Sequence, residues 1–278
     1  MSWLISRLPD ADREHLTRLL ALMGLFFLVI CAIGILRPIK NAVALSGLGH
    51  ADFYRVYLVS AAVVFFVPLY NWIGSRVAWR RMISGTAVAF AGVLLVFRAT
   101  YREGDVAFGL LFYGWYDLLA AVMVSQFFMA TQLYFDARTA KRFYPLVIAG
   151  GALGATFGGL VTGLGADLLG VPNLILVAAV LVAVFGVTAP LVTEEATLET
   201  PGVSRKEEGD ASPLGELAEV FGDSHVRLIT LSVLLTVLVK QLVDFQFNAI
   251  SEQVFRTPEA ISEFQGLFNA ATQWRPLV

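Results

Sequence analysis

Long blocks of uncharged, largely apolar residues are the feature that most constrains this chain. A helix needs about 20 such residues to cross the hydrocarbon core of a bilayer. Six blocks meet or approach that length, at residues 19–36, 56–75, 82–97, 118–135, 143–166 and 168–193. A seventh, 228–250, is interrupted by Lys240 and Asp244, and an eighth begins near Phe264. The pattern predicts an all-α, polytopic helical membrane protein whose main partner is the lipid bilayer.

The composition agrees with this class and argues against several functions. Hydrophobic residues make up 57% of the chain and charged residues 15%, whereas soluble domains carry about 25% charged residues. The single cysteine, Cys31, leaves no disulfide framework. No Ser–His–Asp arrangement, phosphate-binding loop, His/Cys metal spacing or basic nucleic-acid surface stands out. We therefore expect neither an enzyme nor a protein that needs a cofactor, a metal or a nucleic acid.

The charged residues between the blocks predict orientation and domain organisation. Lys and Arg concentrate in cytoplasmic loops, and a cytoplasmic N-terminus puts most of them inside, which predicts a multi-pass protein of the inner (plasma) membrane. We expect a cytoplasmic N-terminal segment, a first six-helix bundle, an acidic cytoplasmic linker and the start of a second bundle. These parts span residues 1–18, 19–192, 193–224 and 225–278. Two bundles are typical of transporters, so we expect a complete version to carry further spans and this chain to be truncated.

Arg37, Lys40 and Asn41 follow the first apolar block and would share one face of a helix, because they are three or four positions apart. If the helix continues to about Leu45, this face reaches a cavity inside the membrane. If it ends earlier, both cations extend to the outer headgroups. Pro38 fits a kink or an end.

Lys240 and Asp244 lie four residues apart in the seventh block. Ionisable residues inside a span are costly and often mark a substrate path, although the pair could also serve helix packing alone. Asp117, by contrast, comes directly before the fourth block and is expected at its boundary, with Tyr113 and Tyr116 in an interfacial aromatic belt.

The fifth block is rich in glycines at regular spacing. Residues four apart share one helix face, and such small residues let membrane helices approach closely. Two adjacent ridges contain Gly150, Gly154 and Gly158, and Gly159 and Gly163. We expect these glycines to pack against a neighbouring helix, with sliding or hinging against the second bundle as a functional alternative.

Four segments resemble the bacterial and plastid ATP/ADP translocase family, whose fold is similar to that of the major facilitator superfamily. They are LRPIKNAV (36–43), GSRVAWRR (74–81), FDARTAKRFYPLVIAGGALGATFGGL (135–160) and QLVDFQFNAISEQVF (241–255). The second departs from the usual facilitator motif, with Ser75 where an Asp is expected and Trp79 near the usual Gly.

The resemblance implies an antiporter that exchanges ATP, ADP or a related small anion by alternating access of two bundles. Arg37, Lys40 and Lys240 would then contact phosphate groups, because Arg holds phosphate by paired hydrogen bonds and Lys acts as a point charge. Asn41 and Asp244 complete the predicted binding set. Two alternatives remain: a transporter of another organic anion or of a proton-coupled solute, and a membrane scaffold without transport. The sequence predicts no oligomeric state.

Overall fold

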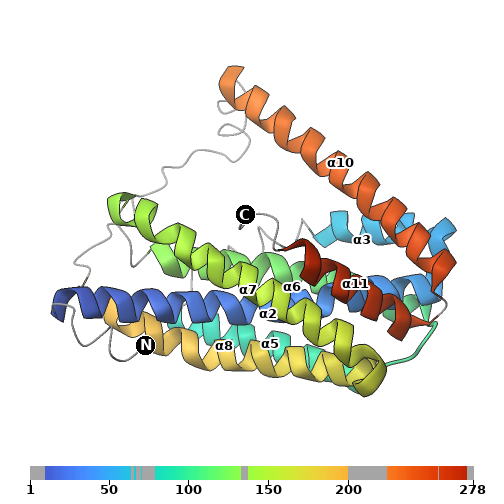
Figure 1. Ribbon diagram of the computed structural model, residues 1–278, viewed down its shortest axis with the longest axis horizontal. Helices are drawn as coiled ribbons and strands as arrows, with labels where there is room; N and C mark the ends of the chain where they lie inside the picture. The colour runs from blue at the N-terminus through green and yellow to red at the C-terminus, as the bar shows by residue number, and fades with distance from the viewer. Residues whose placement is uncertain are drawn as a thin grey trace. The chain divides into compact units, whose positions relative to one another are not determined.

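The computed structural model describes residues 10–63, 66, 70, 79–132, 137–199, 224–255 and 257–273, and every regular element among them is a helix. These are α2 (Asp10–Asp52), α3 (Tyr54–Val63), α5 (Trp79–Ala99), α6 (Val106–Gln132), α7 (Ala137–Leu169), α8 (Val171–Glu199), α10 (Ser224–Val254) and α11 (Pro258–Thr272) (Figure 1). The predicted all-α fold is confirmed.

Six stretches of these helices are long and apolar enough to cross a membrane. They are Leu19–Gly49, Arg81–Ala99, Val106–Thr131, Tyr144–Leu169, Val171–Val192 and Ser224–Val254. Five correspond to the first, third, fourth, fifth and sixth blocks of the sequence, and the last to the seventh. The second block begins with α3, but most of its remainder lies outside the described residues, as does 200–223 of the predicted linker.

Several helix ends differ from the sequence-based boundaries. α2 begins inside the predicted N-terminal segment and runs far beyond the first apolar block, with a break at Gly49. α8 extends to Glu199, into the predicted linker. α6 begins at Val106 because the Asp105 side chain accepts hydrogen bonds from the backbone N–H groups of Ala107 and Phe108, at 2.8 and 3.1 Å. Such a cap satisfies amide groups that have no partner within the helix.

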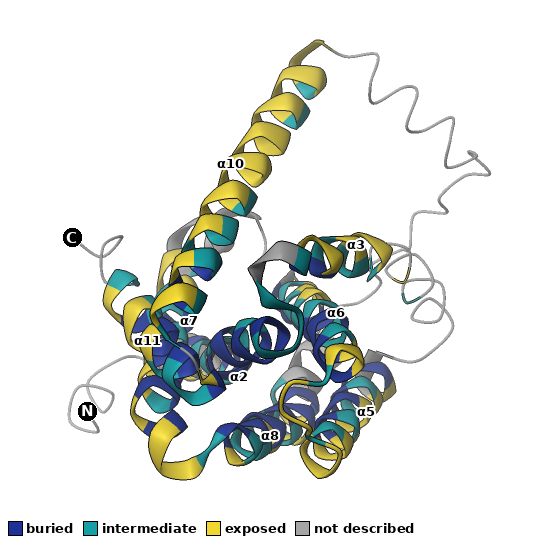
Figure 2. Cartoon of the chain, turned by 90° about the vertical axis from the view of Figure 1, so that its right-hand side faces the viewer, coloured by how far each residue is buried: buried dark blue, intermediate teal, exposed yellow. Residues whose placement is uncertain are grey.

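The chain divides into two compact units. One comprises Met1–Glu199 with Phe255–Val278 and therefore includes α11; the other, Thr200–Val254, contains α10. In the larger unit, α2 contacts α6, α7, α8 and α11, while α5 packs on α8. Figure 2 shows α2 among these helices, with mostly buried residues along it. The core of this unit is thus built around α2.

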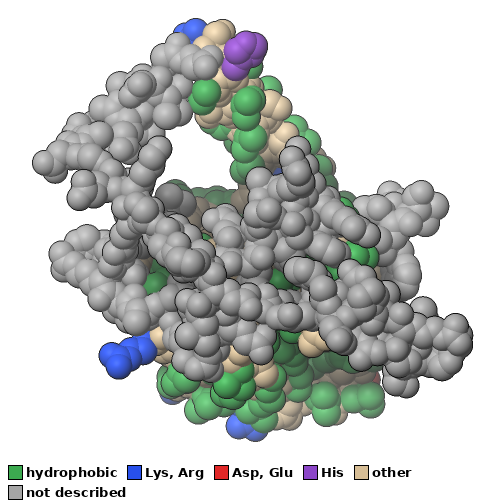
Figure 3. Space-filling model, turned by 90° about the vertical axis from the view of Figure 1, so that its left-hand side faces the viewer, with side chains coloured by type: hydrophobic (Ala, Val, Ile, Leu, Met, Phe, Trp, Pro, Cys, Tyr) green, Lys and Arg blue, Asp and Glu red, His purple; other side chains and the backbone are tan. Residues whose placement is uncertain are grey.

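Apolar side chains also cover the outside of this unit. Leu111, Val88 and Leu164 are each more than 60% exposed, and the described surface in Figure 3 is largely hydrophobic, with few Lys or Arg side chains. Water would penalise so much exposed apolar surface, whereas lipid does not. The outward faces of these helices therefore fit a bilayer.

The glycines of α7 lie where this helix meets two others. A Cβ atom at Gly150, Gly154 or Gly158 would lie 2.7, 2.5 and 2.5 Å from a backbone oxygen of α2. One at Gly159 would lie 2.7 Å from the backbone oxygen of Gly266 in α11, and one at Gly163 would meet Leu267. The first ridge therefore brings α7 against α2, and the second brings it against α11.

Candidate functional site

Arg37, Lys40 and Asn41 lie within α2 and not beyond its end. The helix continues through Pro38 as far as the break at Gly49, so of the two alternatives, the one in which the helix continues to about Leu45 is confirmed and an end at Leu36 is excluded. The neighbouring side chain of Ile39 is fully buried, and Lys40 is 8% exposed. Lys40 therefore does not extend to the headgroups, and its charge needs a partner inside the protein.

Asp117 of α6 supplies that partner. The Nζ atom of Lys40 donates a hydrogen bond to Oδ1 of Asp117 at 2.6 Å, and the hydroxyl of Ser60 in α3 donates to the second carboxylate oxygen. The ammonium group also lies 3.8 Å from the ring centroid of Tyr113 and 4.3 Å from that of Tyr116. Opposite charge and aromatic faces both stabilise a buried cation.

This geometry corrects the expectation for Asp117 and the residues before it. Asp117 is not a boundary residue, because α6 begins at Val106. Tyr113 and Tyr116 are 7% and 6% exposed and do not form an interfacial belt. The signals that could have revealed this are the turn residue Gly104, whose φ is 74°, and the capping residue Asp105.

Asn41 makes a different contact. Its amide nitrogen donates a hydrogen bond to the side-chain oxygen of Gln265 in α11 at 3.0 Å. Gln265 is 1% exposed, so the bond joins two helices that are distant in sequence inside the core. Sequence reasoning did not select Gln265.

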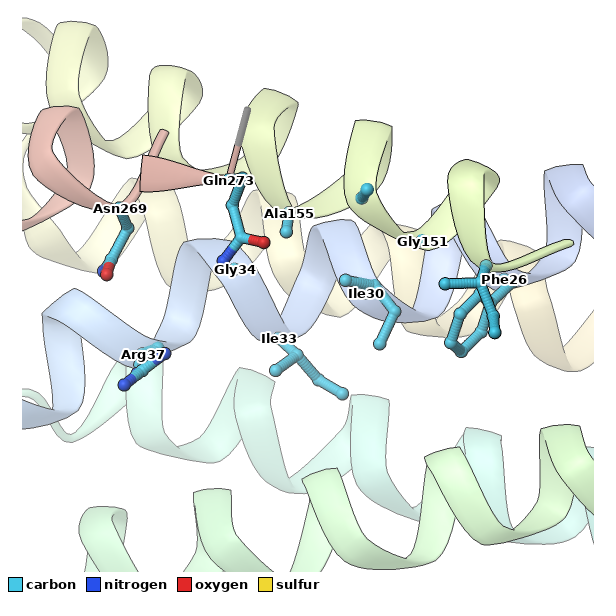
Figure 4. Close-up of a pocket in the computed structure, with 11 residues that line it drawn as sticks. Phe26, Ile30, Ile33, Gly34, Arg37, Gly151, Ala155, Asn269 and Gln273 are labelled. Atoms are coloured by element: carbon cyan, nitrogen blue, oxygen red, sulfur yellow. The ribbon is translucent and has the colours of Figure 1, made fainter. Parts of the chain in front are cut away.

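Arg37 lines a cavity of about 350 Å³ between α2, α7 and α11. Its lining consists of Phe26, Ile30, Ile33, Gly34, Arg37, Ile148, Gly151, Ala152, Ala155, Asn269 and Gln273. Figure 4 shows Arg37 and Asn269 towards one end and Phe26 at the other, with Ile30 and Ile33 between them. Ligand pockets range over roughly 300–1,000 Å³ and combine apolar walls with a few polar groups, a description that this cavity fits.

Lys240 and Asp244 lie on α10, which forms part of the second unit. They share one face of that helix, Lys240 exposed and Asp244 half-buried. Their proximity to the Arg37 cavity stays a prediction, as does the assignment of 225–278 to a second bundle.

The described residues contain no group of three His, Cys, Asp or Glu side chains arranged to hold a metal ion. The fold and the spans define the class: a polytopic, all-α membrane protein. No protein family, curated protein or solved structure matches the chain in comparisons.

Proposed function

We propose that this chain is a membrane transporter, an antiporter that carries a small organic anion by alternating access. The observation that carries the proposal is the position of Arg37. It lies in α2, which carries one of the two longest candidate spans among the described residues, and lines a ligand-sized cavity within the larger unit. An ionisable residue at such a place is costly, so it commonly marks a substrate path.

The chemistry of the cavity favours an anionic substrate. An anion that leaves water for a low-dielectric interior loses its hydration and needs a cation in exchange. Arg offers a planar fork of donors that matches a carboxylate or a phosphate. The side-chain amides of Asn269 and Gln273 add further donors to the same lining.

Nucleotide exchange is the first reaction to test, because the sequence resembles ATP/ADP translocases. In that case Lys40 would reach a phosphate group only by separating from Asp117, and Lys240 would add a further cation. The proposal includes location in the inner (plasma) membrane with a cytoplasmic N-terminus.

The test uses the 278-residue chain in proteoliposomes loaded with ADP, with labelled ATP outside. We expect exchange by the unaltered chain and its loss in Arg37→Ala and in Lys40→Ala. Arg102→Ala is the matched control, because Arg102 lies exposed in the loop before α6. Unchanged exchange in both Arg37→Ala and Lys40→Ala would disprove the role of these cations.

A proton-coupled solute is the second candidate, favoured by the position of Asp117. Its carboxylate contacts Lys40 and Ser60, and the Lys40 ammonium group lies against the rings of Tyr113 and Tyr116. Loss of the negative charge on this carboxylate would leave the Lys40 charge without its counter-ion. Strong pH dependence of uptake, absent in Asp117→Asn and unaffected by nucleotide, would favour this candidate.

A further inference from the structure

The two contacts that α11 makes with its neighbours differ in kind. On the α7 side, a Cβ atom at Gly266 would lie 2.7 Å from the backbone nitrogen of Gly163 and 2.8 Å from the backbone oxygen of Gly159. On the α2 side, the packing is interrupted by the cavity, to which α11 contributes the polar side chains of Asn269 and Gln273. The contact of α11 with α7 is therefore close-packed, whereas the seam between α11 and α2 is hollow and polar.

One hydrogen bond closes this seam next to the cavity. The amide nitrogen of Asn41 donates to the side-chain oxygen of Gln265 at 3.0 Å. Asn41 follows Arg37 by about one turn in α2, and Gln265 precedes Asn269 by about one turn in α11. Arg37 and Asn269 both line the cavity and lie towards the same end of it (Figure 4). The bond therefore lies directly beyond that end, in the direction of the C-terminal end of α2.

Beyond the bond, α11 carries a further polar group. Ser262 is fully buried, and its hydroxyl has no hydrogen-bond partner among the residues that the structure describes. A buried hydroxyl without a partner is unfavourable, and Ser262 shares a helix face with Gln265, three positions further on. The polar side chains of α11 thus continue from the cavity past the amide pair, in the order Gln273, Asn269, Gln265 and Ser262. Polar residues inside a membrane bundle often mark a solute path.

We propose that Asn41 and Gln265 form a gate between the cavity and the membrane surface at the C-terminal end of α2. The gate opens when α11 tilts away from α2 about its close contact with α7, which breaks the amide hydrogen bond. A neutral bond suits this role, because side-chain hydrogen bonds between membrane helices are weak and the separated amides can bond to a passing solute. The inference rests on the proposed function, since an antiporter opens its site to each side in turn.

The test measures how fast a small, membrane-impermeant thiosulfonate reaches a cysteine in the cavity. The reporter is Ile33→Cys, at a residue that lines the cavity, in the 278-residue chain with Cys31→Ala. The reagent is added to intact cells or to inverted membrane vesicles, whichever expose Glu103→Cys. That side is the side of the gate, because a Cβ atom at Gly47 in α2 would lie 3.2 Å from the backbone of Asp105 in the same loop. The reporter should react much more slowly than Glu103→Cys.

Loss of the amide bond should open the path to the reporter. Gln265→Ala should raise the labelling rate of Ile33→Cys by about three- to tenfold, the factor that corresponds to one hydrogen bond between membrane helices. Gln265→Met removes the bond but nearly keeps the volume of the side chain, so it tests the gate even if Gln265→Ala does not fold. The double variant of Asn41→Ala and Gln265→Ala should react no faster than either single variant, because each removes the same bond.

The matched control is another hydrogen bond between two helices. The hydroxyl of Ser84 in α5 donates to the backbone oxygen of Gly186 in α8, also at 3.0 Å. Ser84→Ala should leave the labelling rate of Ile33→Cys unchanged, because this bond lies outside the seam. An equal increase in Ser84→Ala would overturn the inference, since general loosening of the bundle would then explain the access.

Three further results would overturn the gate: labelling of the reporter in the unaltered seam as fast as that of Glu103→Cys, unchanged labelling in Gln265→Met, and rate increases that multiply in the double variant. The readout does not depend on transport. If the unaltered chain exchanges no solute while Gln265→Met still opens the cavity, the gate stands and the proposed antiporter fails. Normal exchange with unchanged labelling in Gln265→Met would leave the antiporter and remove the gate.

Discussion

The ammonium nitrogen of Lys40 and a carboxylate oxygen of Asp117 are 2.6 Å apart, although 77 positions separate the two residues in sequence. Each lies on a helix that crosses the apolar region, α2 and α6. The pair therefore joins two membrane helices by opposite charges, with Ser60 of α3 on the second oxygen of the carboxylate.

Loss of either member of this pair should destabilise the fold more than loss of both. Lys40→Met or Asp117→Leu leaves one buried charge without its counter-ion, which we expect to cost about 3 kcal/mol of unfolding free energy. This is the lower end of the usual range, because the Asp117 side chain is still 22% exposed. The double variant should recover much of the loss. Unfolding in a nonionic detergent, followed by circular dichroism, measures all three.

The control for these three variants is the ion pair of Asp52 and Arg55. Both side chains are 46% exposed, and a guanidinium nitrogen of Arg55 lies 3.1 Å from a carboxylate oxygen of Asp52. Asp52→Asn should leave the unfolding free energy nearly unchanged, because solvent screens exposed pairs. Additive losses in the Lys40 and Asp117 double variant would contradict the predicted coupling.

A second prediction concerns the contact between α7 and α2. A Cβ atom at Gly154 would lie 2.5 Å from the backbone oxygen of Phe27, and a backbone atom cannot move aside as a flexible side chain does. Gly154→Ala should therefore lower the unfolding free energy by about 1–3 kcal/mol, and Gly154→Leu should prevent assembly of the helices. Thermal unfolding and size-exclusion chromatography in detergent measure the two effects.

Gly92 of α5 provides the matched control, because nothing lies within 4 Å of a Cβ atom added there. Gly92→Ala should be neutral or stabilising by about 0.5–1 kcal/mol, since alanine favours helix. The Gly154 variants also test the scaffold alternative. If Gly154→Leu abolishes assembly of the helices while Arg37→Ala and Lys40→Ala behave like the unaltered chain, the result favours a scaffold without transport.

A third prediction concerns the loop between α5 and α6. Burial of the Tyr101 hydroxyl, followed by the negative charges of Glu259 and Glu103, raises the pKa of this phenol above its usual range. The folded state therefore resists deprotonation more than the unfolded state does. This contribution to stability is present below the ordinary tyrosine pKa of about 10 and is lost as the pH rises above that value.

Tyr101→Phe should reduce this alkaline loss of stability. The Tyr101 hydroxyl has no hydrogen-bond partner among the residues that the structure describes, so its removal should cost little at neutral pH. Thermal unfolding at neutral and strongly alkaline pH measures the difference. Tyr54→Phe, at a side chain 53% exposed, is the control and should leave the pH dependence unchanged. Equal alkaline losses in the unaltered chain and in Tyr101→Phe would contradict the prediction.

The fourth prediction tests orientation in the membrane. The native Cys31 is buried and should not react with a membrane-impermeant maleimide. Glu103→Cys, in the exposed loop before α6, should be labelled in intact cells because the predicted topology puts this loop outside. Ser204→Cys, in the predicted cytoplasmic linker, should react only after the cells are opened. The reverse pattern would place the N-terminus on the outer side.

The sequence predicted the helices better than their ends. The apolar blocks identify the spans because a bilayer requires each crossing helix to satisfy its own backbone hydrogen bonds. The start of α6 was predicted wrongly because the fourth apolar block is long enough by itself to span a bilayer. Asp105 was therefore not recognised as the residue that caps this helix. Arg37, Lys40 and Asn41 were selected because polar groups are rare in such a chain, because their spacing puts them on one helix face, and because their segment resembles the ATP/ADP translocase family.

The sequence by itself thus determined an all-α membrane protein, because blocks of this length and low polarity are stable as helices surrounded by lipid. Only the tertiary structure decided that Lys40 pairs with Asp117, that Asn41 reaches Gln265, and that Arg37 lines a cavity of three helices. In a membrane chain, an apolar residue that faces lipid looks the same in sequence as one that faces another helix. The rotation and register of the helices follow instead from close packing, as at Gly154 against Phe27. Such packing depends on two segments that are distant in sequence, so neither segment alone predicts it.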